Sequence, residues 1–477
     1  MIPNWIIVVG GYLLAFAVTL RIVMQRREPT ATLAWALTMM LVPYLGVLLY
    51  LLLGRHRLTR QVRRRRARAA ALEPHLARLE ITESSGRFDS VSISRPPDRE
   101  LVRLSNRMGC RQPTFGNDVR LLVDANEAYQ AMENAIRAAT KHVHFQFYIY
   151  NEDDTGLRFR DLLIQKAKEG VKVRVLTDGV GSFGLDTFMI PLVQAGGQFA
   201  EFLPVGLFSR HWHANLRNHR KNVVVDGRVA FTGGVNIGDE YTGRKRKVGL
   251  WRDTHVQLEG PAVHHVQEAF AEDWFFSTGE EPDDPEWFPE QHRAGNLMVQ
   301  IVASGPDTDT QPIQRIFFTV VTSAKERVYL TTPYFVPDQA MLVALQTTAL
   351  RGVDVRLLLP RRSDQSLALH AGRSYYDELL EAGVRVFEYR PGILHAKTMV
   401  VDQSWATVGS ANMDMRSFRL NFEINAVVYG PDFARQLAEL FEKDLRDAEE
   451  ITKELLDGRG LGRRMAESFA RTLAPVL

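Results

Sequence analysis

The sequence predicts an α/β protein made of two similar halves, preceded by an N-terminal hairpin of two transmembrane helices. Three observations lead to this prediction. The pattern His-x-Lys-x-x-x-x-Asp occurs at residues 219–226 and again at 395–402. Strand-like and helix-like segments alternate in the same order around both copies, which is typical of α/β layers. Two long apolar runs fill most of the first 54 residues, and about 20 apolar helical residues span a bilayer.

The two apolar runs differ in length. The first, Trp5 to Leu20, ends at Arg21, whose long side chain can reach lipid headgroups. The second, Ala31 to Leu53, has 23 residues and no charge. Candidate interfacial anchors are Trp5, Trp35 and Tyr50. A cleaved signal peptide is the alternative for the first run, but that run lacks a basic start and a clear small-residue cleavage site.

The charge around these runs predicts their orientation. Eight arginines follow the second run, against three in the turn between the runs. The eight are Arg55, Arg57, Arg60, Arg63, Arg64, Arg65, Arg66 and Arg68, and the three are Arg21, Arg26 and Arg27. Positive charge stays on the cytoplasmic side, so both termini are expected in the cytoplasm. Beside a membrane span, the cluster favours anionic lipid headgroups over a nucleic-acid patch.

Composition is that of an ordinary folded protein, with 45% hydrophobic and 24% charged residues and a net charge of +3. The single cysteine, Cys110, excludes an intramolecular disulfide and a cysteine-based zinc site. We expect four regions. They are a transmembrane hairpin at 1–54, a basic juxtamembrane and connector segment at 55–110, a first half at 111–285 and a second half at 286–477.

The two halves repeat one order of elements. In the first half, strands are expected at 119–123, 143–150 and 171–176, with helices near 128–139 and 157–168. In the second half, helices are expected at 313–323 and 341–350, with strands at 328–331 and 352–359. Gly260-Pro261 and Gly430-Pro431 each precede an amphipathic helix, and an acidic, proline-rich linker at 280–286 separates the halves. Since each half holds one motif, a site that uses both must lie where the halves meet.

The motif spacing has a structural reading. His219 and Lys221, two residues apart on an extended chain, point to the same side, and Asp226-Gly227 is a strong hairpin-turn signal. Gly233 and Gly234 then allow close backbone approach, which brings Asn236 to the same place. The second copy supplies the equivalents His395, Lys397, Asp402, Gly409 and Asn412. Imidazole, ammonium and amide groups that converge suit a phosphate and its developing charge.

A single motif of this kind could be an ordinary hairpin with polar surface residues. Its repetition with matched Gly and Asn argues for a duplicated site. As turn residues, the motif aspartates Asp226 and Asp402 are better explained by structure than by chemistry. No metal or other cofactor is expected. The pairs His211/His213 and His264/His265 lack the partners that zinc needs. The stretch from Phe202 to Trp212 either faces lipid or packs on the core.

The paired motifs resemble those of the phospholipase D superfamily. The segments 217–227 and 232–241 are similar to bacterial cardiolipin synthases in particular, and the resemblance covers nearly the whole chain. It implies two phospholipase-D-like α/β sandwich halves with the active site on their pseudo-twofold interface. It also implies a bacterial cytoplasmic (inner) membrane location. The implied reaction converts two phosphatidylglycerols into cardiolipin and glycerol through a phosphatidyl-histidine.

The resemblance also assigns roles. It makes His219 the nucleophile and His395 the acid/base, although two near-identical motifs leave that choice open. A carboxylate downstream of each motif, Asp253 or Glu423, would fix a histidine ring. From their chemistry, Lys221 and Lys397 would hold the phosphoryl oxygens, with Asn236 and Asn412 adding hydrogen bonds. Three alternatives stay open: a phospholipase D that uses water, a nuclease and an inactive membrane scaffold. The membrane runs disfavour nucleic acid as a partner, and a homo-oligomer is left open.

Overall fold

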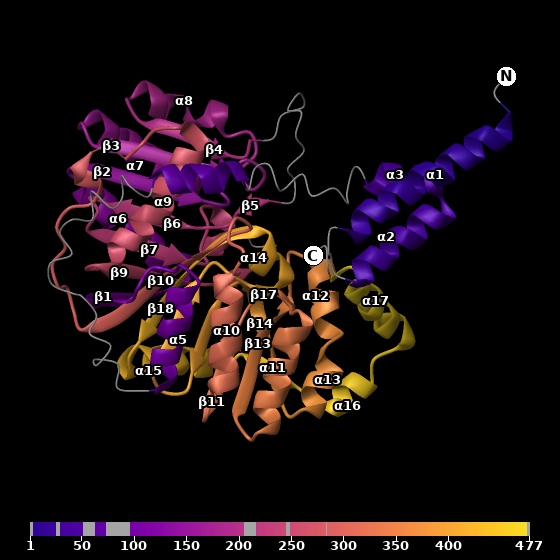
Figure 1. The fold of residues 1–477 in the computed structure, drawn as a ribbon. Helices are drawn as coiled ribbons and strands as arrows, with labels where there is room; N and C mark the ends of the chain where they lie inside the picture. The colour runs from indigo at the N-terminus through magenta and orange to yellow at the C-terminus, as the bar shows by residue number, and fades with distance from the viewer. Residues whose placement is uncertain are drawn as a thin grey trace. The chain divides into compact units, whose positions relative to one another are not determined.

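The computed structural model describes residues 3–24, 29–50, 63–72, 96–204, 216–244, 249–282 and 284–474. The chain divides into two compact units, Met1–Arg63 and Arg64–Leu477. Three sequence-based expectations lie outside the described ranges. They are the 202–212 stretch from residue 205 onward, the pair at 211 and 213, and the arginines Arg26, Arg27, Arg55, Arg57 and Arg60. The ribbon of both units is drawn in Figure 1.

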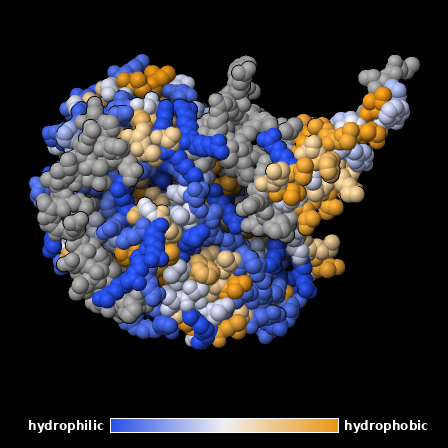
Figure 2. Space-filling model, in the orientation of Figure 1, coloured by the Kyte–Doolittle hydropathy of each residue, from blue (hydrophilic) through white to orange (hydrophobic). Residues whose placement is uncertain are grey.

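The described part of the N-terminal unit contains the helices α1 (Asn4–Val23), α2 (Pro29–Leu41) and α3 (Pro43–Leu49). The second apolar run was expected as one continuous helix, but it breaks at Val42. Pro43 opens α3 at a first-turn position, where its missing N–H costs nothing. Within the described ranges, no helix combines the length and the apolar character that crossing a bilayer requires. Large apolar side chains cover the outside of this unit (Figure 2).

The first half contains a seven-stranded mixed sheet in the order β1-β9-β7-β6-β2-β3-β4. Its strands are β1 (Thr114–Val123), β2 (His142–Phe147), β3 (Lys172–Asp178), β4 (Gln198–Phe202), β6 (Asn222–Val225), β7 (Val229–Gly233) and β9 (Thr254–Glu259). Its helices are α6 (Asp124–Ala138), α7 (Asp154–Lys168), α8 (Asp186–Gln194) and α9 (Ala262–Thr278). The helices and strands expected from periodicity all occur, with ends shifted by a few residues.

The second half repeats this order as β10-β18-β16-β15-β11-β13-β14, with β19 added at the edge. Its strands are β10 (Leu297–Ser304), β11 (Arg327–Thr331), β13 (Asp354–Arg362), β14 (Arg385–Leu394), β15 (Thr398–Val401), β16 (Trp405–Gly409), β18 (Asn421–Tyr429) and β19 (Ala448–Ile451). Its main helices are α10 (Pro312–Ser323), α11 (Gln339–Leu350), α12 (Ser366–Arg373), α13 (Tyr376–Glu381), α15 (Pro431–Leu445) and α17 (Leu461–Thr472). The two halves are therefore structural repeats.

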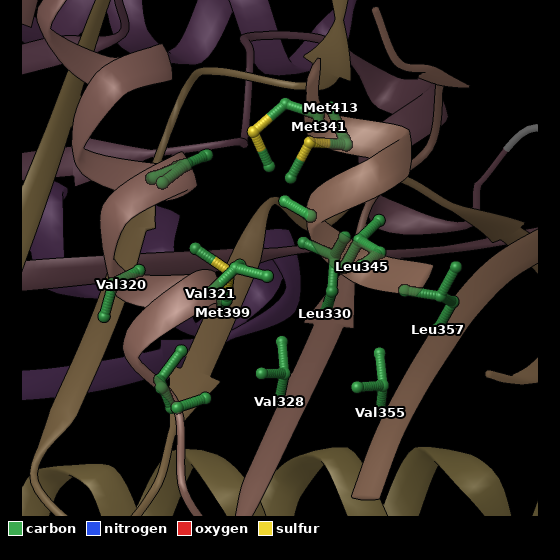
Figure 3. Packing of buried hydrophobic residues seen from close by; sticks show 14 of the residues in the cluster. Val320, Val321, Val328, Leu330, Met341, Leu345, Val355, Leu357, Met399 and Met413 are labelled. Atoms are coloured by element: carbon green, nitrogen blue, oxygen red, sulfur yellow. The ribbon is translucent and has the colours of Figure 1, made fainter. Parts of the chain in front are cut away.

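Each half has its own core, and a third cluster joins the halves. In the second half, β-branched and leucine side chains of β11 and β13 face α10 and α11, as Figure 3 shows for Val328, Leu330, Val355 and Leu357. The joining cluster takes Val256 and Leu258 of β9 together with strand and helix residues of the second half. The strand β1 also links the halves, since Thr114–Asn117 pairs with β10 and the remainder with β9.

Candidate active site

Each motif histidine lies beside a strand of the opposite half. His219 follows the two-residue strand β5 (Arg217–Asn218), which runs parallel to the start of β18. His395 follows β14, whose end runs parallel to β8 (Leu250–Arg252). The amide of His219 donates to the Phe422 carbonyl at 2.9 Å, and that of His395 donates to the Arg252 carbonyl at 2.8 Å. These two short pairings bring both motifs to the interface of the halves.

Because of these strand pairings, each histidine contacts a carboxylate that belongs to the opposite half. Glu423, on the strand beside β5, places both carboxylate oxygens 3.0 Å from Nδ1 of His219. Asp253, just after β8, places Oδ2 at 2.6 Å from Nδ1 of His395. Each histidine is thus oriented by a carboxylate from the half that does not contain it. In both rings the contact engages Nδ1 and leaves Nε2 as the nitrogen that can react.

The two carboxylates are held differently. Ser410 donates from its Oγ to Glu423 at 2.5 Å, and Asn421 donates from Nδ2 at 3.1 Å. The equivalent of Ser410 in the first motif is Gly234, where an added Cβ would lie 2.0 Å from Oδ1 of Asp253. The first motif therefore has Gly234 because Asp253 leaves no room for a side chain, and the second has Ser410 because its hydroxyl donates to Glu423. The Gly/Ser difference can be seen in the sequence, but its reason is apparent only when the position of each carboxylate is known.

The motif lysines are buried beside the histidines. Lys221 and Lys397 each donate from Nζ to the carbonyl of their own motif histidine. Burial, assisted by the charge of Lys397, holds the pKa of Lys221 well below its usual range. Burial lowers the pKa of Lys397 to about 8, although Asp253 and Glu423 act in the opposite direction. An anion between the lysines would restore the charge on both, because it compensates the cost of burial.

Burial also favours the neutral form of the histidines. It lowers the pKa of His219 to about 4, with help from Lys221 and against the opposing Glu423. Burial and Lys397 lower the pKa of His395 in the same direction. Burial raises the pKa of Glu423, but His219 and Lys221 outweigh it and keep this carboxylate ionised. At neutral pH the structure therefore pairs neutral imidazoles with carboxylates.

The two motif asparagines are placed differently. Asn236 is buried, with Oδ1 accepting from the Ile149 amide at 3.1 Å and Nδ2 donating to the Tyr241 hydroxyl at 3.0 Å. Among the described residues, only one of its two amide hydrogens has an acceptor. Asn412 is buried too, and its Oδ1 has no hydrogen-bond partner among those residues.

Asp226 and Asp402 have the same structural role in the two halves. Both lie in the left-handed region, with φ of 52° and 51°, and both turn the chain after a motif strand. The carboxylate of Asp226 accepts the backbone amides of Thr140, Lys141 and His142. That of Asp402 accepts the amides of residues 325–327 in the same way. Each aspartate ties its hairpin to the start of a neighbouring central strand.

Aromatic residues that the motif analysis missed surround the histidines. Tyr148 meets His219 edge-on at 4.9 Å between ring centroids. Trp251 lies 5.1 Å from His395, with Tyr241 at 6.1 Å and Tyr334 at 6.4 Å. Tyr148 and Tyr334 follow central strands and Trp251 lies two residues before Asp253, whereas Tyr241 has neither position. These signals are too weak to identify the aromatic residues beforehand.

A second missed feature lies beneath His219. The buried carboxylate of Asp273 accepts hydrogen bonds from Asn218 at 2.9 Å and from Arg220 at 2.8 Å, the two neighbours of His219. It also accepts from Arg65 at 2.7 Å. Arg65 further pairs with Asp307 and lies 4.5 Å from the Phe422 ring centroid. The expectation that the arginine cluster faces lipid headgroups is wrong for Arg65, since its guanidinium is buried within the protein.

Within the described residues, no three His, Cys, Asp or Glu side chains are grouped as a metal ion would need. Of the two histidine pairs considered from the sequence, His264 is engaged by the Pro289 carbonyl at 2.8 Å.

Comparison with known proteins defines first the fold and then the class of protein. A phosphatidylserine synthase from Haemophilus influenzae superimposes with a TM-score of 0.59 at 15% identity, covering 79% of this chain and 98% of that one. At this identity the likeness concerns the fold alone. The family model described as cardiolipin synthase, PLD-like domain, matches residues 132–274 and 318–445, and one described as phospholipase D-nuclease N-terminal matches 13–55. The repeated half-sheets and paired motifs are thus those of a phospholipase-D-like protein.

Curated relatives narrow the class. "Cardiolipin synthase 2" of Bacillus cereus is 40% identical over 466 residues, or 97% of this chain and 90% of the relative. "Cardiolipin synthase" of Halalkalibacterium halodurans is 39% identical over 483 residues, or 99% and 95% of the two chains. The chain belongs to the cardiolipin synthase family of the phospholipase D superfamily.

Proposed function

We propose that the protein is a membrane phosphatidyltransferase that converts two phosphatidylglycerols into cardiolipin and glycerol. The observation that carries the proposal is the crossed pair of dyads, His219 with Glu423 and His395 with Asp253. Two buried lysines beside these dyads add the positive charge that a phosphodiester requires. The names of the relatives point to the same reaction.

The first half-reaction moves the phosphatidyl group to the protein. Nε2 of neutral His219 attacks phosphorus and forms a P–N bond, while the bond from phosphorus to the glycerol oxygen breaks. Protonated His395 gives its proton to that oxygen, so free glycerol leaves. The carboxylate of Asp253 beside Nδ1 stabilises the imidazolium that forms when His395 takes up a proton. Since the anionic substrate raises the pKa of a neighbouring imidazole, binding prepares His395 as the acid.

The second half-reaction reverses these roles. His395 takes the proton from a hydroxyl of the second phosphatidylglycerol, the oxygen attacks phosphorus, and the P–N bond to His219 breaks. Atoms balance, since two phosphatidylglycerols give one cardiolipin and one glycerol. Lys221 and Lys397 neutralise the non-bridging oxygens, and the free amide hydrogen of Asn236 and the side chain of Asn412 add hydrogen bonds.

The runner-up is hydrolysis to phosphatidic acid, in which water replaces the second lipid. Transfer prevails only if the acceptor hydroxyl is held near His395, where positioning supplies effective molarities of about 10⁵ M or more. The small exposed fractions of His219 and His395, 7% and 4%, favour a site that limits water.

Membrane attachment through residues 1–54 is part of the proposal, with a short external turn and the catalytic halves on the cytoplasmic side of the inner membrane. The two apolar runs, the family match at 13–55 and the outward apolar side chains of the N-terminal unit support it. The proposal also divides the chain into four regions, 1–54, 55–110, 111–285 and 286–477. A Cys110→Ser protein carrying Thr30→Cys should react with an impermeant thiol reagent in intact cells, and one carrying Asp309→Cys should not. The opposite pattern would refute this topology.

The test of the reaction uses the purified full chain in vesicles of phosphatidylglycerol. Cardiolipin and glycerol should form in equal amounts, and added glycerol should drive the exchange backwards. His219→Ala and His395→Ala should abolish it, whereas His370→Ala, at a partly exposed position on α12, should not. Phosphatidic acid as the main product would identify a hydrolase, and no turnover of any phospholipid a scaffold.

The nucleophile is tested separately. Denaturing the wild-type protein during turnover should trap labelled lipid on His219, and the His395→Ala protein should form this adduct far more slowly, because it lacks the acid for the departing glycerol. Labelling of His395 in the His219→Ala protein, at the wild-type rate, would reverse the assignment.

A further inference from the structure

The C-terminal helix α17 has its small residues facing the protein and its large apolar residues facing outward. Ala470 and, just beyond the helix, Ala474 are buried against Val336 and Ala371 of the second half. On the opposite side Leu461, Met465 and Phe469 are 74%, 64% and 65% exposed. These three are four residues apart and so form one stripe along the helix. Figure 2 shows hydrophobic residues over α17, at the right-hand edge of the second half.

This orientation is fixed by ion pairs. Glu467, which is buried, accepts from Arg459 at 2.6 Å, and Arg459 also pairs with Asp377 of α13 at 2.7 Å. Near the other end, Arg471 pairs with Glu378 at 2.7 Å and lies 4.3 Å from the Tyr375 ring centroid. A helix held at both ends cannot rotate its stripe inward. Exposing three large apolar side chains forfeits about 25 cal/mol per Å² of burial, and a partner that covers the stripe would recover this free energy.

The charges of the helix indicate which partner. Its exposed charged side chains, Arg463 and Arg464, are both basic, while its one acid, Glu467, is buried. An apolar stripe with arginines beside it is the pattern of a helix that lies in the plane of a membrane interface. A second copy of the chain fits less well. A helix of 12 residues is about 18 Å long, too small to supply the roughly 800 Å² per partner of a stable interface.

We propose that α17 is a second membrane contact, in which Leu461, Met465 and Phe469 enter an anionic lipid surface and the adjacent arginines meet its headgroups. This contact goes beyond the proposed reaction, since it holds whether the acceptor is a lipid or water. It also does not depend on the hairpin. Its consequence is that the catalytic halves are held against the bilayer at their own C-terminal end, rather than only by a tether.

Depth measurement by electron paramagnetic resonance tests the proposal on the full chain. A nitroxide on Phe469→Cys in the Cys110→Ser protein, reconstituted in phosphatidylglycerol vesicles, should be reached by oxygen and not by a water-soluble nickel complex. The control is Arg435→Cys on the exposed side of α15, which nickel should reach. Nickel access at position 469 would overturn the proposal. Protection from both reagents would also overturn it, because it would show coverage by protein.

A kinetic test has an independent readout. Replacing Leu461, Met465 and Phe469 together by serine should raise the vesicle concentration for half-maximal rate about tenfold, because three inserted side chains are lost. The rate on soluble short-chain phosphatidylglycerol and the melting temperature should not change, because the stripe packs on no part of the described protein. Unchanged vesicle dependence would overturn the proposal. Equal loss on the soluble substrate would do so as well.

Discussion

At the scale of single residues, the site depends on partners far apart in the chain. His219 and Glu423 are separated by 204 positions, and Asp253 and His395 by 142. The two motifs were predictable because their pattern is local and repeated. Which carboxylate serves which histidine was not predictable, because it follows from β5–β18 and β8–β14, pairings of two and three residues without a periodic signal.

The crossed dyads make a first prediction. Glu423→Gln keeps the shape of the side chain but removes the charge that stabilises an imidazolium, so kcat should fall about 10²–10⁴-fold with a smaller change in KM. Asp253→Asn should behave in the same way through His395. The matched control is Glu439→Gln on the exposed face of α15, which should leave kcat unchanged. Single-turnover rates would measure the loss, and a kcat within twofold of wild type would contradict the pairing.

The buried lysines make a second prediction, on pH dependence. Burial lowers the pKa of Lys397 to about 8, so the cation is present below that pH and lost above it. The value of kcat/KM for an anionic phospholipid should therefore fall as the pH rises from 8 to 10, in the free enzyme. Lys397→Arg should weaken this basic limb, since guanidinium stays charged. A flat profile to pH 10 in the wild-type protein would exclude this role.

At the scale of elements, periodic segments were predicted well and charge clusters were not. The helices near 128–139 and 313–323 appear as α6 and α10 because their apolar spacing matches one buried face. The arginine cluster has no periodic pattern that fixes its environment, because an arginine can pair with a lipid phosphate as well as with a buried carboxylate. Only the fold shows that Arg65 meets Asp273 and Asp307, whereas Arg66 pairs with the exposed Asp309.

That contrast gives the third prediction. Arg65→Met leaves Asp273 and Asp307 buried with less compensating charge, which should cost about 3–5 kcal/mol of unfolding free energy. Arg66→Met breaks a solvent-exposed pair with Asp309 and one hydrogen bond to the Asp307 carbonyl, and it should cost about 1–2 kcal/mol. Thermal unfolding of the two proteins in the same detergent compares them directly. Because Asp273 also holds Asn218 and Arg220 beside His219, the first variant should lose kcat as well. Equal melting temperatures would show that the buried cluster is not structural.

At the scale of the whole molecule, the duplicated motif predicted two halves, and the sheets confirm it strand by strand. The sequence could not show how the halves are joined. The strand β1 looks like one segment of the first half, yet Thr114–Asn117 pairs with β10 of the second half. Parallel pairings at β5 and β8 then close the site from both sides. The chain from residue 64 onward should therefore unfold as one unit. The pH dependence of its free energy of unfolding should reflect buried ionisable groups.

The first half contains several such groups, and they give the last prediction. Burial lowers the pKa of His142 to about 4 and that of His255 to about 3, and it holds the pKa of His144 well below its usual range. In the unfolded chain each takes up a proton near pH 6.5. Between that pH and the folded value the unfolded state binds more protons, so stability is complete above about pH 7 and falls as the pH drops. The slope is about 1.4 kcal/mol per pH unit for each histidine.

His255 is the best single test, because neither of its ring nitrogens has a hydrogen-bond partner in the part of the chain that the structure describes. His255→Leu should reduce the loss of melting temperature between pH 7 and pH 5, while the exposed control His292→Gln should follow the wild-type curve. The two variants should differ little at pH 8, where the histidine is neutral in both states. A His255→Leu curve parallel to wild type at every pH would show that acid destabilises the protein through other groups.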